Sequence, residues 1–171
     1  MSVRIGDDIP SWDMPDVEAA RMKTMAAILR DPYSVHWDRS ANEHIGLAGR
    51  VVNQGPLNLG YLVNMLLSWA GPSCVRRLTV TFGRPVLDGD HVVAKGRVIR
   101  LDAVDQDREL GGDPPGTLRA TCEIWLERDG ERVVQGSAVV ALPSTTTPTT
   151  QTPPTPPTPP TPPTTPATIT T

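Results

Sequence analysis

Residues 56–70 read PLNLGYLVNMLLSWA, a run whose apolar side chains cover most of a helical wheel. Gly60, Asn64 and Ser68 fall four apart and form the one narrow stripe of small or polar side chains. A helix that is apolar nearly all round is usually buried inside a protein. Because a proline suits the first turn and Gly71-Pro72 stops a helix, we predict a long buried helix over this run.

After this helix the sequence alternates between apolar and polar residues, which is typical of antiparallel strands with one covered and one solvated face. The predicted inward-facing residues are Leu78, Val80 and Phe82, then Val92, Ala94 and Val98, then Leu118, Ala120, Cys122, Ile124 and Leu126, then Val134, Ala138, Val140 and Leu142. Residues 87–90 (LDGD) and Asp129-Gly130 are turn signals between strands. Residues 42–52 and 102–116 are predicted to be loops, because they are rich in glycine or polar residues.

The segment before the long helix predicts a short strand at residues 11–14 and a second helix at residues 18–30. This helix is rich in strong helix formers, and Asp16 is its predicted N-cap. Pro32 disfavours helical geometry at the residue before it, so Asp31 is predicted to leave the helix in an extended conformation.

One long buried helix and a long-stranded antiparallel sheet predict an α+β domain, in which the sheet wraps around the helix as in the hot-dog architecture. We assign this domain to residues 1–142. Residues 143–171 are almost entirely threonine and proline and predict a disordered, polyproline-like tail. The tail is interpreted as a linker or partner ligand, or as an extension without a role. A single such sheet leaves an open edge, so dimers are expected.

The bulk composition limits the classes of function. The 171 residues suffice for one domain, and a net charge of -3 gives no basic face for nucleic acid. No segment predicts a signal peptide, and the longest apolar run is too short to span a bilayer. Cys74 and Cys122 lack metal-ligand spacing and are predicted to be buried, reduced thiols, which favours a cytoplasmic protein without a bound metal.

Residues 30–39 (RDPYSVHWDR) carry the candidate chemistry, with Asp31 and His36 five positions apart. Taken alone, such a pair is more often a helix cap and a surface histidine. The pair, however, precedes the helix start Asn53-Gln54-Gly55, where free N–H groups can hold a developing negative charge. An acid, an imidazole and an oxyanion site are the minimum for adding water to, or removing it from, a carbonyl-activated substrate.

The DPYSVH run resembles the Asp-x-Asn-Pro-x-His loop of the MaoC-like enoyl-CoA hydratases (hydratase 2), and the similarity continues through residues 51–55 and 82–90. Within that family the resemblance is strongest to the small catalytic subunit of the actinobacterial steroid side-chain enoyl-CoA hydratase. It rests on the segments RD (30–31), VH (35–36), DR (38–39), VN (52–53) and WAGPS (69–73). Tyr33 and Ser34 replace the family's asparagine and proline, and its His-Gly becomes Asn53-Gln54, with Gly55 one position late.

The resemblance implies that the chain hydrates trans-2-enoyl-CoA thioesters to 3-hydroxyacyl-CoA, or runs the reverse dehydration, in steroid or fatty acyl side-chain degradation. Asp31 and His36 would hold a water molecule and move its protons, and the amide of Gln54 or Gly55 would bind the thioester oxygen. Asn53 would orient His36 or water, or would cap the helix. No cofactor is expected beyond the coenzyme A of the substrate. The expected partner is a second hot-dog subunit, in a homodimer or a heteromer.

Two rival functions remain, an acyl-CoA thioesterase and a non-catalytic hot-dog subunit that completes a partner's acyl pocket. Among other residues, Asp38 is interpreted as a carboxylate that braces the loop in preference to a third catalytic acid. His44 and His91 are interpreted as surface residues. The arginines that could meet coenzyme A phosphates are Arg76, Arg77, Arg84 and Arg97.

Overall fold

The structure, a computed structural model, describes residues 3–104, 113–114 and 116–143. Its elements are β1 (Asp8–Met14), α1 (Ala19–Leu29), the 3-10 helix η1 (Ser34–His36), α2 (Arg39–His44), α3 (Gly55–Ala70), β2 (Val75–Phe82), β3 (Val92–Ala103), β4 (Leu118–Arg128) and β5 (Glu131–Ala141). The five strands form one antiparallel sheet in the order β1-β3-β4-β5-β2. Except for Pro143, the predicted Thr/Pro tail lies outside the described residues, as does most of the loop predicted at 102–116.

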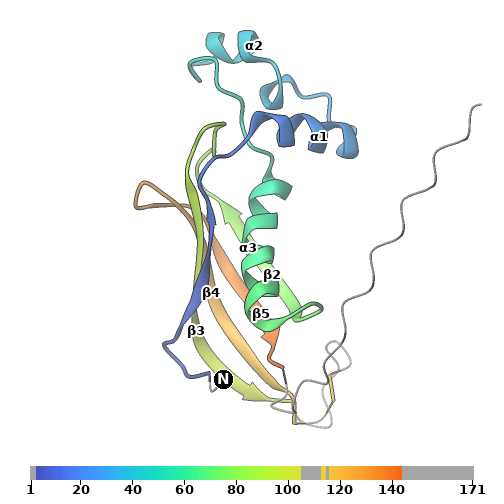
Figure 1. Ribbon diagram of the computed structural model, residues 1–171, viewed down its shortest axis with the longest axis vertical. Coiled ribbons are helices and arrows are strands. Elements are labelled where there is room, and N and C mark those ends of the chain that lie inside the picture. Colours follow the sequence, from blue (N-terminus) through green and yellow to red (C-terminus); the bar gives the residue numbers. More distant parts are fainter. Residues whose placement is uncertain (1–2, 105–112, 115, 144–171) are drawn as a thin grey trace, which may run out of the picture.

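The sheet curls around α3, which lies along its concave face and contacts all five strands (Figure 1). Leu62, Met65 and Leu66 of α3 have no exposed surface, and they share one core with Ile124 and Leu126 of the central strand β4. This confirms the predicted α+β hot-dog architecture. The stripe of small and polar residues on α3 faces outward at Asn64 and Ser68, which are exposed.

The hairpin between β4 and β5 turns at Asp129-Gly130, as predicted. Both residues have positive φ angles, 51° and 80°, which is the geometry of a type I′ turn. At β2 the alternation was less informative, because Phe82 is 51% exposed although it was predicted to face the core. Phe82 ends an edge strand beside the first residue of α3, so its ring covers the helix start instead of entering the core.

Three boundaries differ from the sequence-based predictions. The helix α2, at residues 39–44, overlaps the start of the loop predicted at residues 42–52. The first strand was predicted to begin at residue 11, but it begins at Asp8 and contains a bulge between Ile9 and Trp12. The residue at the N-cap of α1 is Glu18, and not Asp16, and no side chain caps this helix. The prediction at Asp16 was wrong because the chain continues in an extended conformation to Glu18 before it turns into the helix.

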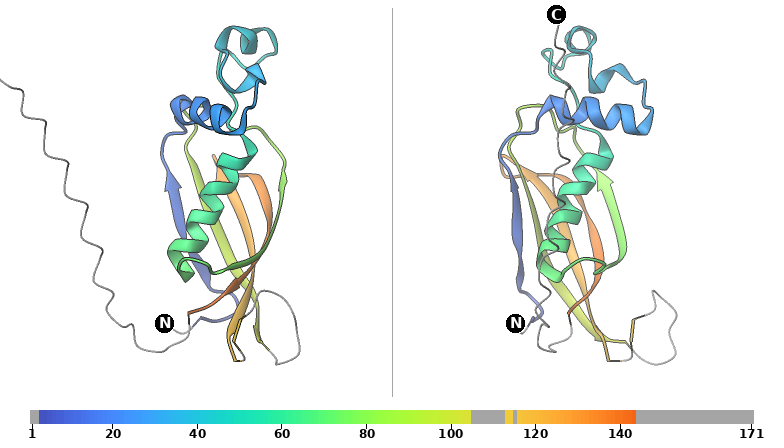
Figure 2. Two further views of the ribbon diagram at one scale, coloured as in Figure 1. Left: turned by 90° about the vertical axis from the view of Figure 1, so that its right-hand side faces the viewer. Right: turned by 45° about the vertical axis from the view of Figure 1, so that its right-hand side comes forward.

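The helices α1, η1 and α2 lie together beyond the N-terminal end of α3 (Figures 1 and 2). They form a helical arm, residues 19–49, outside the sheet and its central helix. Both cysteines, by contrast, are buried in the body of the domain and are free thiols. Among the described residues no helix is long and apolar enough to cross a membrane.

Candidate active site

Asp31 and His36 face each other in the helical arm. The helix α1 ends at Leu29, and Arg30 adopts a left-handed conformation with a φ of 53°, which turns the chain back so that the Asp31 N–H donates to the Ala26 carbonyl (2.9 Å). The Asp31 Oδ1 accepts a hydrogen bond from the Tyr33 N–H (3.0 Å), and its Oδ2 lies 3.6 Å from the His36 Nε2. This separation exceeds a good direct hydrogen bond, but one water molecule can bond both atoms.

A backbone carbonyl defines the orientation of the His36 imidazole. The Nδ1 atom of His36 lies 2.7 Å from the Val52 oxygen. Because a carbonyl oxygen only accepts, the proton of the neutral ring must sit on Nδ1, which leaves the lone pair of Nε2 directed toward Asp31. The Tyr33 ring packs edge-on against the imidazole, with 6.0 Å between the ring centroids.

His36 also borders a cavity of about 300 Å³ at the start of α3. The cavity is lined by His36, Val52, Asn53, Gly55, Asn58, Phe82, Gly83, Arg84 and Pro85. Its wall therefore combines an imidazole, a helix N-terminus, two amide side chains and an apolar strip. The side chains of His36 and Asp31 are 14% and 30% exposed, so the pair is partly shielded from solvent.

At the helix start, the sequence left the backbone amides of Gln54 and Gly55 as alternatives, and these two residues have different surroundings. The Gln54 side chain is buried, and its Nε2 donates to the Met22 carbonyl (2.8 Å), which joins α3 to α1. The N–H groups of Leu57 and Asn58 donate to the Gln54 carbonyl, and proline 56 has no N–H. Gly55 lines the cavity and Gln54 does not, which makes Gly55 the stronger candidate of the two for a first-turn donor at the cavity.

Asn53 is buried and bonds another asparagine. Its backbone N–H donates to the Val86 carbonyl (2.7 Å), and its side-chain Nδ2 donates to the Asn58 Oδ1 (2.7 Å). The residue at the N-cap of α3 is Gln54. Burial raises the pKa of the neighbouring Tyr61, and a hydrogen bond with Asn53 offsets part of this rise. The side chain of Asn53 thus belongs to a polar pair in the cavity wall.

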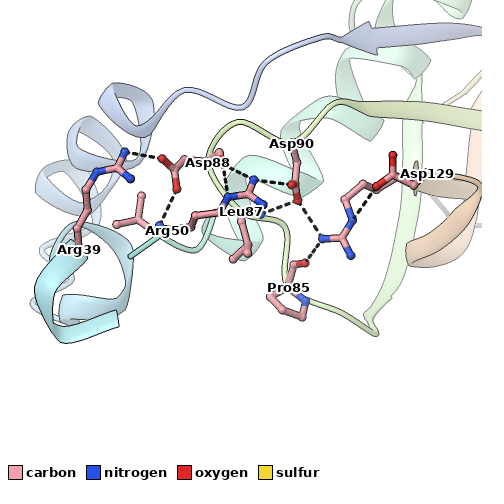
Figure 3. A network of polar contacts seen from close by, with 9 residues as sticks. Arg39, Arg50, Pro85, Leu87, Asp88, Asp90 and Asp129 are labelled. Atoms are coloured by element: carbon pink, nitrogen blue, oxygen red, sulfur yellow. Dashed lines mark hydrogen bonds and ion pairs between the residues drawn. The ribbon is translucent and has the colours of Figure 1, made fainter. Parts of the chain in front are cut away.

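Sequence reasoning missed the residues that hold the helical arm in place. The Asn42 side chain, 1% exposed, donates to the carbonyls of Val35 and Arg50 (both 2.9 Å). A second group lies in the turn between β2 and β3, where Asp88 and Asp90 bond three arginines (Figure 3). No periodicity or motif marks Asn42, and the partners of both aspartates are distant in sequence.

The other candidates are mainly paired on the surface. Asp38 caps α2 by accepting from the Ala41 N–H (3.1 Å), as a loop-bracing carboxylate would. His91 lies 2.6 Å from Asp13 with both side chains more than half exposed, and His44 contacts the Ser40 carbonyl. Of the four arginines considered for phosphate binding, Arg84 alone lines the described cavity.

The Asp90 carboxylate should make the free energy of unfolding depend on pH in the acid range. Burial alone would raise the pKa of Asp90, but hydrogen bonds from the Leu87 N–H, Arg50 and Arg128 outweigh it and hold the pKa below the ordinary 3.8. A depressed carboxylate pKa stabilises the fold fully above the unfolded value and loses this contribution as pH falls through the folded value. We expect Asp90→Asn to lower the free energy of unfolding at pH 7 by about 1–3 kcal/mol.

Urea denaturation at neutral and acid pH measures this effect. The deficit of Asp90→Asn should shrink as the pH falls below the ordinary carboxylate pKa, because the wild-type protein then loses the same contribution. A deficit that stays constant down to the acid limit of folding would contradict the assignment.

These features define a hot-dog protein in which a histidine paired with an aspartate lines a cavity at a helix N-terminus, while the aspartate itself lies outside the lining of that cavity. Solved structures share this fold. R-hydratase PhaJ1 from Pseudomonas aeruginosa has a TM-score of 0.66 at 17% identity, covering 82% of this chain and 83% of that one. The (R)-hydratase from A. caviae involved in PHA biosynthesis has a TM-score of 0.66 at 23% identity, covering 83% and 98%.

The ChsH1–ChsH2 complex from Mycobacterium tuberculosis contains a chain with a TM-score of 0.63 at 19% identity, with 84% of this chain and 100% of that chain covered. A MaoC-like dehydratase from Rhodospirillum rubrum also matches, at 22% identity. At these identities the likeness is one of fold. No protein-family model matches the sequence, and no curated protein matches it.

Proposed function

We propose that this protein is a hydro-lyase of the MaoC-like type, which adds water to a trans-2-enoyl-CoA thioester or removes it from a 3-hydroxyacyl thioester. The observation that carries the proposal is the position of His36. Its ring borders the cavity that Gly55, the first residue of α3, also lines, and its Nε2 lies 3.6 Å from the Asp31 Oδ2. The hot-dog fold shared with (R)-hydratases and a MaoC-like dehydratase supports the same reaction class.

In the proposed reaction the thioester oxygen accepts a hydrogen bond from the Gly55 N–H, which draws electron density away from the β-carbon. A side chain at position 55 would approach the Phe82 ring to 3.3 Å, so glycine leaves room beside this donor. One well-placed oxyanion donor contributes about 3–4 kcal/mol to transition-state stabilisation. The positive end of the α3 dipole acts in the same direction.

Asp31 and His36 together hold the attacking water. The pair takes a proton from this water as its oxygen bonds to the β-carbon, and a proton is delivered to the α-carbon, which gives the 3-hydroxyacyl product. Because the Nδ1 proton is bonded to the Val52 carbonyl, Nε2 is the imidazole atom that can exchange a proton with the water. Tyr33 replaces the family's asparagine, but its backbone N–H donates a hydrogen bond to the Asp31 carboxylate. This bond supports the proposed role of Asp31 in holding the water.

The active form is proposed to contain a second hot-dog chain. In the described structure β2 is an edge strand, and Phe82 at its end is half exposed beside the cavity. The ChsH1–ChsH2 complex, whose fold this chain shares, joins two different polypeptides. A homodimer or a heteromer would cover this edge and could enlarge the acyl pocket for fatty or steroid-bearing substrates.

We expect the purified chain, alone or co-expressed with a hot-dog neighbour, to abolish the enoyl absorbance of but-2-enoyl-CoA without releasing a thiol. A thiol reagent in a parallel sample separates this outcome from a thioesterase, which would release coenzyme A. Rates on short, long and steroid-bearing enoyl-CoAs then identify the acyl group. Thiol release with unchanged enoyl absorbance, or no turnover under either condition, would contradict the proposal.

A further inference from the structure

We propose that Asp88 is a positioning residue for His36, an inference that rests on the proposed hydratase function for its effect on rate. Asp88 lies in the turn between β2 and β3, whereas His36 belongs to η1 in the helical arm. The Asp88 side chain is only 12% exposed. Its two oxygens bond the two chain segments that determine where the His36 ring sits (Figure 3).

The first segment contains Val51 and Val52. The Asp88 Oδ1 accepts a hydrogen bond from the Val51 N–H (2.7 Å), and the Asp88 N–H donates to the Val51 carbonyl (2.9 Å). Val52 forms an antiparallel bridge with Leu87, the residue before Asp88. The Val52 carbonyl in turn accepts the Nδ1 proton of His36. Asp88 therefore holds the residue before the carbonyl that determines the tautomer of the imidazole, together with the bond from the Asn53 N–H to the Val86 carbonyl.

The second segment follows His36 directly. Arg39 is the first residue of α2, and its guanidinium forms a hydrogen-bonded ion pair with the Asp88 Oδ2. The same carboxylate thus bonds the chain on both sides of the ring, once through Val51 and once through Arg39. Between Asp31 and Ala48 only Asn42 is buried, so polar bonds such as these contribute to holding His36 in place.

Asp90 offers a matched control two positions further along the same turn. Its carboxylate is at least as enclosed as that of Asp88, with 8% exposure, and it also pairs with arginine. It bonds Arg50, Arg128 and the Leu87 N–H, and so touches the same turn and the residue before Val51. The bonds to the Val51 N–H and to Arg39, however, belong to Asp88 and would remain in a variant of Asp90. Loss of Asp90 should lower stability without releasing the carbonyl that holds His36.

The test compares Asp88→Ala, Asp88→Asn and Asp90→Asn in the full chain with its active partner. We expect Asp88→Ala to lower kcat by about 10²-fold with little change in KM, because misplacing a catalytic group by about 1 Å costs this much. Asp88→Asn retains an oxygen for the Val51 N–H and loses the ion pair, so its kcat should lie between that of the wild type and that of Asp88→Ala. Asp90→Asn should keep the wild-type kcat and pH–rate profile.

A readout independent of activity is the ¹⁵N NMR spectrum of the histidine rings, of which the chain has 3. We expect wild-type His36 to show one tautomer, protonated on Nδ1, and Asp88→Ala to show a mixture, while His44 and His91 stay unchanged. A mixture in Asp88→Ala supports the positioning role even if the wild-type protein hydrates no enoyl-CoA, which would defeat only the proposed function.

An unchanged His36 tautomer together with an unchanged pH–rate profile in Asp88→Ala would overturn the proposal, however much stability the variant loses. If Asp88→Ala does not fold, Asp88→Asn decides by the same two readouts. A change of tautomer in Asp90→Asn as large as in Asp88→Ala would also overturn it, since the effect would then belong to the whole turn.

Discussion

Asp31→Asn and His36→Ala should each lower kcat for enoyl-CoA hydration by about 10²–10⁴-fold, the usual contribution of a positioned acid or base. Asp31→Asn keeps the shape of the side chain and an acceptor for the Tyr33 N–H, but it removes the negative charge beside Nε2. His36→Ala removes the ring that borders the cavity and its bond to the Val52 carbonyl. Steady-state kinetics on but-2-enoyl-CoA measures both effects.

In the proposed reaction both side chains act on one water molecule, so the double variant should be scarcely slower than the slower single variant. His44→Ala is a suitable control, since His44 is a surface histidine of the same arm. Thermal unfolding of all variants should stay close to that of the wild type, because neither the Asp31 nor the His36 side chain is fully buried. Near-normal turnover in Asp31→Asn and His36→Ala would remove the pair from the mechanism.

Gly136→Ala should destabilise the fold more than an alanine at any other described glycine, because the added Cβ meets the closest contacts there. Gly136 lies in β5 and pairs with Val80 of β2, where the two backbones approach closely. An added Cβ would overlap the Thr79 carbonyl and lie 2.8 Å from the Val80 Cα, both of them backbone atoms that cannot rotate away. We expect the free energy of unfolding to fall by about 3 kcal/mol or more, since overpacking typically costs about 1–3 kcal/mol even where side chains can adjust.

Gly60→Ala is the matched control, because it should raise the free energy of unfolding instead of lowering it. Gly60 lies inside α3, and an added Cβ would meet no atom within 4 Å. Alanine is favoured over glycine within a helix by about 1 kcal/mol, so this variant should gain stability. Urea unfolding of both variants at one protein concentration tests the pair. Equal stability of Gly136→Ala and the wild type would show that β2 and β5 can separate at this point without cost.

The parts of the fold that the sequence predicted well are those in which apolar periodicity is long. The helix α3 and the strands β3 to β5 bury one face each, and burial leaves a repeating pattern. The helix α2 lacks such a pattern, because its sequence RSANEH buries only Asn42. Phe82 shows the limit of alternation, which identifies the face of a strand but not where the covering helix ends.

The candidate site was predictable only where its residues are neighbours in sequence. The spacing of Asp31 and His36 alone favours a helix cap and a surface histidine, and the pair was singled out by the helix start that follows it and by the resemblance of the DPYSVH run to a family loop. Gly55 was one of two alternatives at that helix start. Which of Gln54 and Gly55 lines the cavity could not be predicted, because it depends on tertiary packing such as the bond from the Gln54 side chain to Met22 in another helix. Asp88 was visible only as a turn residue, since its role comes from a pairing between the turn and residues 51–52 that no local pattern encodes.

The helical arm has a thermodynamic consequence of its own. Between Asp31 and Ala48 only Asn42 is buried, so this segment has almost no hydrophobic core and is held by polar bonds. Regions of this kind open at a lower free energy than the rest of a domain. Inactivation by mild denaturant should therefore precede the loss of the sheet, and substrate that bridges His36 and the α3 terminus would raise the stability of the arm itself.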